Sequence, residues 1–156
     1  MSDDGSKLIP YKRARFSTHL PAEFLYTPSH AWMQKVDDHT WRVGITKFAT
    51  RMLGEMVDHG FEVKPDAKIE CGQILGWIEG FKAISDIYGI VEGNFLRSND
   101  VLKKKITLVN KQPYSDGWLY EATGEPDARC TDVNDYMAFL DKAIDKILEK
   151  EMQDDE

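Results

Sequence analysis

The sequence has only two cysteines and no long run of hydrophobic residues. Cys71 and Cys130 lack the CxxC and Cys/His spacings of zinc sites, so they predict two free thiols rather than a disulfide or a metal site. No apolar stretch is long enough to cross a bilayer, and residues 1–7 lack the apolar core of a signal peptide. These absences predict a cytoplasmic protein with no membrane partner and no bound metal.

Positive charge is also in short supply. The chain has 20 lysines and arginines against 27 acidic residues, which gives a net charge of −7. A nucleic-acid-binding surface needs many clustered cations, and the groups at 12–15 and 103–105 are too small to form one. The composition therefore predicts no nucleic-acid partner, and the lysines at 103–105 are expected to lie in a solvated connection.

The usual catalytic motifs are missing. The chain has no GxGxxG after a strand, no GxxxxGK[ST], no HExxH and no GxSxG. The four histidines are scattered without a ligand spacing, and His30 beside Trp32 is expected to pack or to form a hydrogen bond rather than to act as a base. No nucleophile–base pair is visible, so we do not expect an enzyme with an active site of its own.

Length and composition suit one domain. The 156 residues are 42% hydrophobic and 30% charged, which is enough for one core and too little for two. We expect a flexible N-terminal segment over residues 1–15, a single domain over residues 16–149 and an acidic tail over residues 150–156.

Short β-forming runs dominate the body of the chain. The runs at 31–36 and 41–45 flank a polar turn and predict a hairpin. Between residues 55 and 96, repeated glycines interrupt β-forming residues, which predicts a sharply bent sheet or flattened barrel. Further strands are expected at 106–109 and 117–122.

Two helices are expected among these strands. Thr46 caps a short helix that Gly54 ends in a left-handed conformation. A longer amphipathic helix starts at Thr131 or Asp132, and we expect it to pack against the sheet rather than to dock a partner. Its apolar stripe consists of Val133, Tyr136, Met137, Leu140, Ile144, Ile147 and Leu148.

Lys82 is the candidate functional residue. It lies in a short apolar frame, residues 78–88, with β-forming segments on both sides. A lysine at the tip of a hairpin is held out to solvent on a rigid support, where another enzyme can acylate its amine. Glu79 and Asp86 bracket this lysine, and they are an acid–base pair, recognition marks or ordinary hairpin charges.

Four blocks give the chain a resemblance to a known family. They lie at residues 26–32, 43–54, 79–88 and 108–119. In this order they resemble the glycine cleavage H proteins, which are lipoyl carriers. The resemblance implies a mainly β fold, a flattened barrel or sandwich of the biotinyl/lipoyl-domain type with short helices and a C-terminal amphipathic helix.

The resemblance also implies the chemistry of Lys82. Its ε-amine would carry lipoate in amide linkage, attached by a lipoate ligase or lipoyl transferase. Glu79 and Ala83 match positions that such an enzyme reads, Asp86 is a further candidate, and Phe81 with Ala83 favours lipoate over biotin. The arm would be a tether ending in a dithiolane that carries a substrate fragment and electrons.

The implied partners are a glycine decarboxylase, an aminomethyltransferase and a dihydrolipoamide dehydrogenase, with the protein as a non-catalytic carrier of an aminomethyl group. The chain departs from the family pattern at Ala31, Gly80, Phe81, Gly89-Ile90 and Gln112. It also resembles H-like lipoate-binding proteins that carry sulfur intermediates for a heterodisulfide-reductase-like complex in sulfur oxidation. An unmodified H-like interaction scaffold is the remaining alternative.

Overall fold

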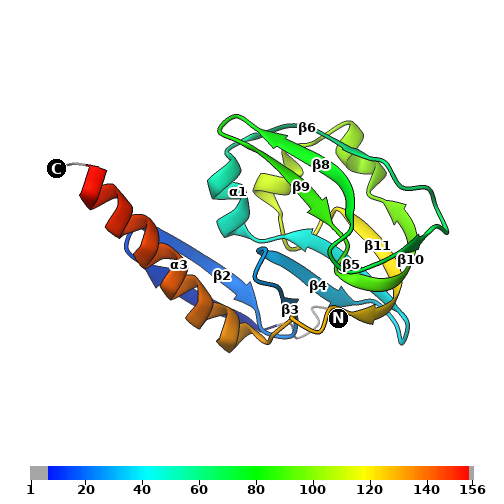
Figure 1. Cartoon of the computed structure of the whole chain (residues 1–156), viewed down its shortest axis with the longest axis horizontal. Coiled ribbons are helices and arrows are strands. Elements are labelled where there is room, and N and C mark those ends of the chain that lie inside the picture. Colours follow the sequence, from blue (N-terminus) through cyan, green and yellow to red (C-terminus); the bar gives the residue numbers. More distant parts are fainter. Residues whose placement is uncertain (1–6, 155–156) are drawn as a thin grey trace.

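The computed structural model describes residues 7–154, and antiparallel strands form most of it (Figure 1). In chain order the elements are β1 (Leu8–Arg13), β2 (Phe16–Pro21), β3 (Leu25–Tyr26), β4 (Ala31–Lys35), β5 (Thr40–Ile45), α1 (Lys47–Leu53), β6 (Met56–Phe61), β7 (Lys68–Ile69), β8 (Ile74–Gly80), β9 (Ile84–Tyr88), β10 (Val91–Ser98), the 3₁₀ helix η1 (Asp100–Lys103), α2 (Leu108–Lys111), β11 (Tyr120–Pro126) and α3 (Val133–Asp154). None of the helices in this part of the chain has the length and apolar character needed to span a bilayer.

Two sheets enclose the main core. One has six strands in the order β3-β4-β5-β11-β10-β7, and the other has three in the order β6-β8-β9. Buried side chains from both sheets, such as Met33 and Val43 from the first and Ile78 and Ile87 from the second, pack in one cluster. Burial of one face of each sheet is the main source of stability in such a sandwich. The predicted mainly β sandwich or flattened barrel is confirmed.

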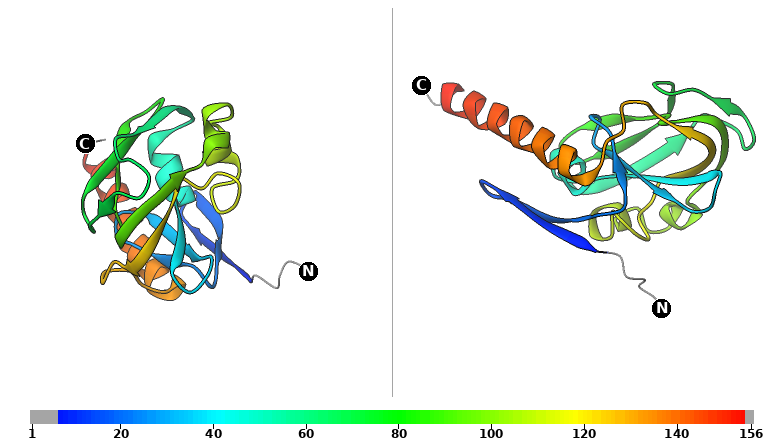
Figure 2. Two further views of the ribbon diagram at one scale, coloured as in Figure 1. Left: turned by 90° about the vertical axis from the view of Figure 1, so that its right-hand side faces the viewer. Right: turned by 90° about the horizontal axis from the view of Figure 1, so that it is seen from below.

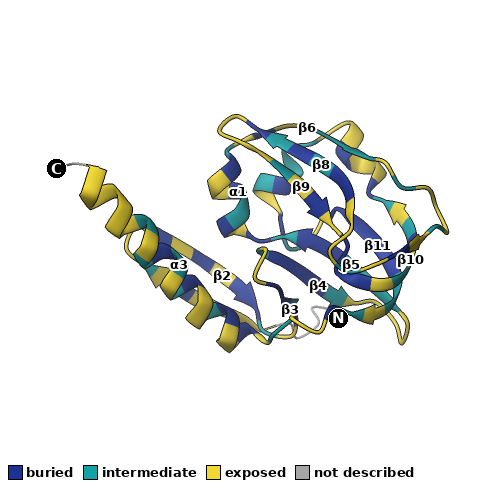
Figure 3. Cartoon of the chain, in the orientation of Figure 1, coloured by how far each residue is buried: buried dark blue, intermediate teal, exposed yellow. Residues whose placement is uncertain are grey.

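A second core joins the two ends of the chain. The β1–β2 hairpin lies beside α3, away from the larger sheets (Figures 1 and 2). The Tyr11 hydroxyl donates to Asp141 Oδ1 at 2.8 Å, and the Arg13 guanidinium pairs with Asp145 at 2.7 Å. The buried face of α3 is turned toward the hairpin, and its exposed face toward solvent (Figure 3). The helix was expected to pack against the sheet rather than to dock a partner, and it packs against the β1–β2 hairpin and against Tyr26 of β3.

The local signals for the hairpin and for the first helix are confirmed. Strands β4 and β5 pair as predicted, and the Thr46 side chain accepts a hydrogen bond from the Ala49 amide to cap α1. Gly54 ends that helix with a φ of 85°, a conformation that glycine adopts at little cost. At α3, Asp132 accepts from the Asp135 amide at 2.9 Å and marks the helix start.

Both chain ends differ from expectation. Residues 8–13 form β1, so a flexible segment over residues 1–15 is wrong for this stretch. The hairpin is ordered because Tyr11 and Phe16 bury their rings against the second core. The expected acidic tail continues α3 as far as Asp154, since its glutamates and lysine are good helix formers. Residues 1–6 and 155–156 lie outside the described residues, so the rest of that division stays a prediction.

Two expected strands also need correction. Residues 108–111 form α2 instead of a strand, and β11 begins only at Tyr120. The helical turn buries Val109 and places Asn110 where its side chain accepts from the Met56 amide at 2.9 Å and donates to the Gly54 carbonyl at 3.1 Å. These tertiary contacts override the β propensity of the apolar run.

His30 has the structural role predicted for it. Its Nδ1 lies 2.8 Å from the Tyr136 hydroxyl, and its ring packs against Phe48. Burial lowers the pKa of His30 to about 4, so the ring is neutral near pH 7. Cys71 and Cys130 are free thiols, as expected.

Candidate functional site

Lys82 lies at the tip of the β8–β9 hairpin. Glu79 pairs with Ile84 in the register, which leaves Gly80 to Ala83 as the turn. The Gly80 amide donates to the Ala83 carbonyl at 2.9 Å and closes this turn. The turn therefore projects beyond the paired strands, and the Lys82 side chain is exposed.

Backbone hydrogen bonds to residues at and just after the end of α1 hold the turn in place. The amides of Phe81 and Lys82 donate to the carbonyls of Glu55 and Leu53 at 3.0 and 2.9 Å. A Cβ atom at Gly80 would collide with the Leu53 carbonyl oxygen, so glycine is the residue that permits this close approach. The backbone at the tip is thus fixed while the lysine side chain stays accessible.

The amine of Lys82 has few competing interactions. Its Nζ donates to the Arg51 carbonyl at 3.3 Å, a long hydrogen bond at an exposed position. Within residues 7–154, no ion pair joins Lys82 to a carboxylate. Such an amine is open to acylation by an enzyme that approaches from solvent.

The other predicted site residues lie on the same hairpin but not in contact with the amine. Glu79 is half-buried near the end of β8, and Asp86 is exposed on β9 opposite Trp77. Asp86 pairs with Trp77, which lies two residues before Glu79 on β8. The side chains of Glu79 and Asp86 therefore point to the same face of the hairpin. Ala83 is exposed in the turn. The geometry makes all three available to an enzyme that reads the hairpin, while neither carboxylate pairs with Lys82 as an acid–base group would.

Exposed apolar side chains surround the lysine. Phe81 is 78% exposed and Ile84 is 66% exposed. Large apolar side chains clustered at an exposed site usually mark a surface that a partner contacts. From the sequence, Phe81 is a departure from the family pattern and, with Ala83, a residue that favours lipoate over biotin, but its exposure depends on the turn geometry.

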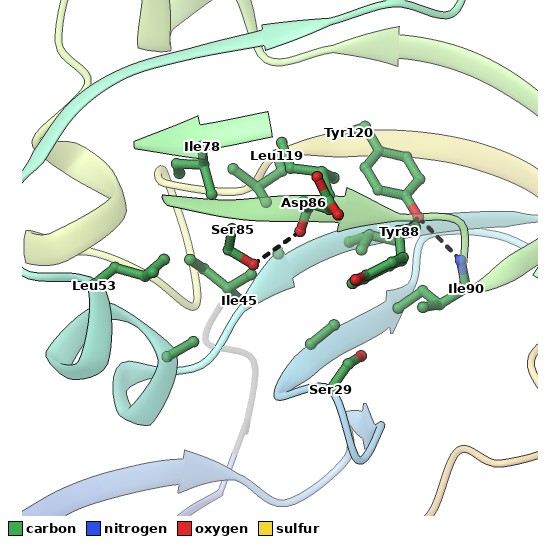
Figure 4. A pocket seen from close by; sticks show the side chains of 15 residues that line it. Ser29, Ile45, Leu53, Ile78, Ser85, Asp86, Tyr88, Ile90, Leu119 and Tyr120 are labelled. Atoms are coloured by element: carbon green, nitrogen blue, oxygen red, sulfur yellow. Dashed lines mark hydrogen bonds between the residues drawn. The ribbon is translucent and has the colours of Figure 1, made fainter. Parts of the chain in front are cut away.

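A small cavity lies behind the hairpin, between β9 and the ends of β4 and β5 (Figure 4). Ser29, Ile45, Ser85 and Asp86 are among its lining residues, and its volume is about 50 Å³. That space suits a few water molecules at most.

A much larger groove lies on the α1 side of the lysine, and we call it the Lys82 groove. Its volume is about 860 Å³, and Lys82 itself forms part of its wall. The other walls come from the β1–β2 turn at 13–16, from α1 at 48–52 and from α3 at 144–151. No local sequence signal indicates this groove, because its walls are far apart in the chain.

Comparison with known proteins agrees with this architecture. The family model described as "Glycine cleavage H-protein" matches residues 24–143. The glycine cleavage system H protein of Corynebacterium jeikeium is 39% identical over 109 residues, which cover 67% of this chain and 84% of that protein. The H protein of Salmonella arizonae is 36% identical over 124 residues, covering 78% and 94% of the two chains.

A solved structure shares the fold. The crystal structure of a glycine cleavage system H protein from Mycobacterium marinum superposes with a TM-score of 0.69 at 24% identity, covering 76% of this chain and 97% of that one. This likeness confirms the predicted fold class. With more than half of its residues matched by the family model, the chain belongs to the glycine cleavage H-protein family.

Proposed function

We propose that the protein is a lipoyl carrier and that Lys82 bears lipoate in amide linkage. The observation that carries this proposal is the geometry of the tip. An exposed amine stands on a turn whose backbone is hydrogen-bonded at two consecutive residues, with Lys82 bonded to the last residue of α1 and Phe81 to Glu55 just beyond it. A fixed root with a free amine is what a swinging arm requires.

The residues around Lys82 suit such a group. Acylation removes the positive charge, and within residues 7–154 no carboxylate forms an ion pair with Lys82 that would be lost. The amide formed keeps one N–H, which can still donate to the Arg51 carbonyl. When bound, lipoate supplies a dithiolane that accepts and releases electrons through thiol–disulfide exchange. The protein supplies position and presentation, and it acts as a non-catalytic carrier.

The relatives indicate the pathway. Curated relatives over most of the chain are named glycine cleavage system H proteins. We therefore place the carrier between a glycine decarboxylase, an aminomethyltransferase and a dihydrolipoamide dehydrogenase, in the cytoplasm, with an aminomethyl group and reducing equivalents as its cargo. Glu79, Ala83 and Asp86 are then marks for the lipoate ligase or lipoyl transferase. Tethering raises the local concentration of the arm at each partner, so weak docking suffices.

One observation favours a second pathway. Phe81 is 78% exposed directly beside Lys82, so a departure from the family pattern alters the surface nearest the arm. Partner enzymes contact this surface, and a changed surface suits a changed partner. The second candidate is therefore an H-like carrier of sulfur intermediates for a heterodisulfide-reductase-like complex.

The test begins with modification. The protein is expressed in cells that contain an active lipoyl ligase, and intact mass with peptide fragmentation is measured for wild type and for Lys82→Arg. We expect one lipoyl group on Lys82 and none on the variant, which keeps the charge but cannot be lipoylated. An unmodified wild type would instead support the interaction scaffold and refute the carrier.

Pathway is tested with the lipoylated protein. Mixed with a glycine decarboxylase and labelled bicarbonate, it should support exchange of label into glycine. No exchange, together with thiol-dependent coupling to a sulfur-oxidising complex, would favour the second candidate.

A further inference from the structure

Cations gather at the Lys82 groove, although the chain as a whole has 27 acidic residues against 20 basic ones. The charged residues of its lining are Arg13, Arg15, Arg51, Lys82 and Glu151. Arg13 is paired with Asp141 and Asp145 on α3. Within residues 7–154, no carboxylate forms an ion pair with Arg15, Arg51 or Lys82. The groove therefore presents a basic surface on an acidic protein, and this surface favours an anionic ligand.

Apolar side chains lie between these cations. The buried floor of the groove consists of Phe16, Phe48 and Ile144. Above it Met52 is 49% exposed and Leu148 is 38% exposed. The Arg51 guanidinium lies 5.8 Å from the centroid of the Phe16 ring, so charged and apolar surface adjoin. A ligand that fits this surface needs both carboxylates and an apolar side chain, because burial of apolar area and pairing of charge then both favour binding.

Two walls of the groove come from segments outside the family match. The family model covers residues 24–143, whereas the β1–β2 turn precedes that range and the α3 residues of the groove, Ile144 to Glu151, follow it. The two segments extend together from one side of the molecule (Figure 2). Ion pairs from Arg13 to α3 join them. The groove is therefore a feature that this chain adds beside its candidate modification site.

We propose that the Lys82 groove docks the enzyme that acylates Lys82, by taking up a segment of that enzyme in which carboxylates flank an apolar side chain. This proposal rests on the proposed function and adds a recognition surface outside the hairpin. The carboxylates pair with Arg15 and Arg51, and the apolar side chain covers Met52 and Leu148. Because Lys82 forms part of the groove wall, a segment docked there holds the enzyme next to the amine.

The charge of Lys82 favours this enzyme over the partners that use the finished arm. Among the proposed partners, the attaching enzyme meets the bare ammonium group. During acylation Nζ forms an amide bond with the lipoyl carbonyl, the activating group of the lipoyl donor leaves, and the ammonium group loses two protons. The groove thereby loses one cation, so its attraction for an acidic segment falls once the amide has formed. Docking is thus strongest for the substrate, and the product is released more readily.

The kinetics of lipoylation test the ionic part of this docking. A purified lipoate ligase that modifies the wild type is used, with the carrier as the varied substrate. Arg15→Glu should raise KM by at least about five-fold and change kcat by less than about two-fold, because docking changes and the chemistry does not. The matched control is Lys12→Glu, which makes the same charge reversal on the same hairpin at an exposed residue that does not line the groove. Its KM should equal that of wild type.

A second pair of variants tests the apolar part. Leu148→Gln should raise KM by about three-fold, since it removes apolar contact area from the wall. Met152→Gln lies on the same helix at a residue that is 69% exposed and outside the groove, and it should leave KM unchanged. Added salt should raise the KM of wild type more than that of Arg15→Glu, because salt screens the ionic contact that the variant already lacks.

A binding measurement tests the role of the lysine charge without turnover. The ligase is titrated with Lys82→Arg, which keeps the cation, and with Lys82→Gln, which has the neutral charge of the acylated residue. Lys82→Gln should bind about three-fold more weakly than Lys82→Arg, and Arg15→Glu should weaken both. Equal affinity of the two lysine variants would contradict release driven by loss of charge.

The outcomes separate this proposal from the one on which it rests. Circular dichroism first establishes that each variant is folded. A wild type that carries no lipoyl group in cells with active ligase refutes the carrier and the docking together. Lipoylation with the same KM in wild type, Arg15→Glu and Leu148→Gln refutes the docking alone. If these variants instead impair only loading by glycine decarboxylase, the groove belongs to a different partner and the proposal is also overturned.

Discussion

The amide of Lys82 donates a hydrogen bond to the carbonyl oxygen of Leu53, 2.9 Å away, and so ties the tip of the β8–β9 hairpin to the last residue of α1. The carbonyls at a helix end lack partners within the helix, and here the hairpin turn supplies one. Each element satisfies polar groups of the other. The position of the lysine therefore depends on α1 as much as on its own strands.

Gly80→Ala tests this attachment. A Cβ atom at residue 80 collides with the Leu53 carbonyl, so the turn must move or the hydrogen bonds must break. We expect a loss of about 2 kcal/mol in the free energy of unfolding and slower lipoylation. Urea denaturation and a lipoylation time course measure the two effects.

Gly72→Ala is the matched control, because Gly72 has a φ of 88° but nothing lies within 4 Å of its added Cβ. It should cost about 1 kcal/mol from backbone strain and leave lipoylation at the wild-type rate. Equal lipoylation rates in both variants would show that the tie to α1 does not matter for modification.

Glu79→Gln tests the recognition role of the hairpin carboxylate. The side chain shares a face with Asp86, and within the described residues it forms no ion pair. We expect lipoylation to slow by about tenfold, the effect of losing one charged contact to the ligase, with stability changed by less than about 0.5 kcal/mol. Glu62→Gln, at an exposed position outside the hairpin, is the control. Normal modification of the Glu79 variant would remove this residue from the recognition set.

Phe81→Val tests the link between the altered surface and partner choice. Because Phe81 is 78% exposed, the free energy of unfolding should change by less than about 0.5 kcal/mol. Exchange of bicarbonate into glycine should rise if the exposed ring hinders docking to a glycine decarboxylase. An exchange rate equal to that of wild type would show that this position does not influence that partner.

His30 predicts a pH dependence of stability. Burial lowers its pKa to about 4, against about 6.5 in the unfolded chain, so between these values the unfolded state binds more protons. Stability should therefore fall as pH decreases from 7 to 4, with roughly 2–3 kcal/mol attributable to this ring. Urea denaturation at several pH values should show a shallower dependence for His30→Gln. His59, whose pKa burial also lowers, contributes in the same direction in both proteins. An unchanged slope would contradict the burial argument.

Local signals predicted the parts of the fold that depend on neighbouring residues. Thr46 and Gly54 indicated where α1 begins and ends, and the polar turn between β4 and β5 indicated a hairpin. The same reasoning located the Lys82 turn, because glycines and β-forming residues frame it. The exposure of the Lys82 side chain also follows from its place in a turn between two β-forming segments.

Long-range contacts decided the rest. Residues 108–111 became a helical turn because Asn110 bridges to Gly54 and Met56, which are more than fifty residues away. Residues 8–13 became a strand because α3 packs against the β1–β2 hairpin, and no local sequence pattern indicates this packing. The walls of the Lys82 groove come from the β1–β2 turn, α1 and α3, which long-range contacts bring together, so sequence spacing could not predict the groove.

The pairing of the two chain ends has a consequence for how such a chain could arise. The β1–β2 hairpin and the outer part of α3 bury apolar side chains in the same cluster, which contains both Tyr11 and Ile144. A chain that carried only one of these additions would present an uncovered apolar face to water. We therefore expect relatives to have both extensions or neither, so that gain or loss of the pair is a single evolutionary event.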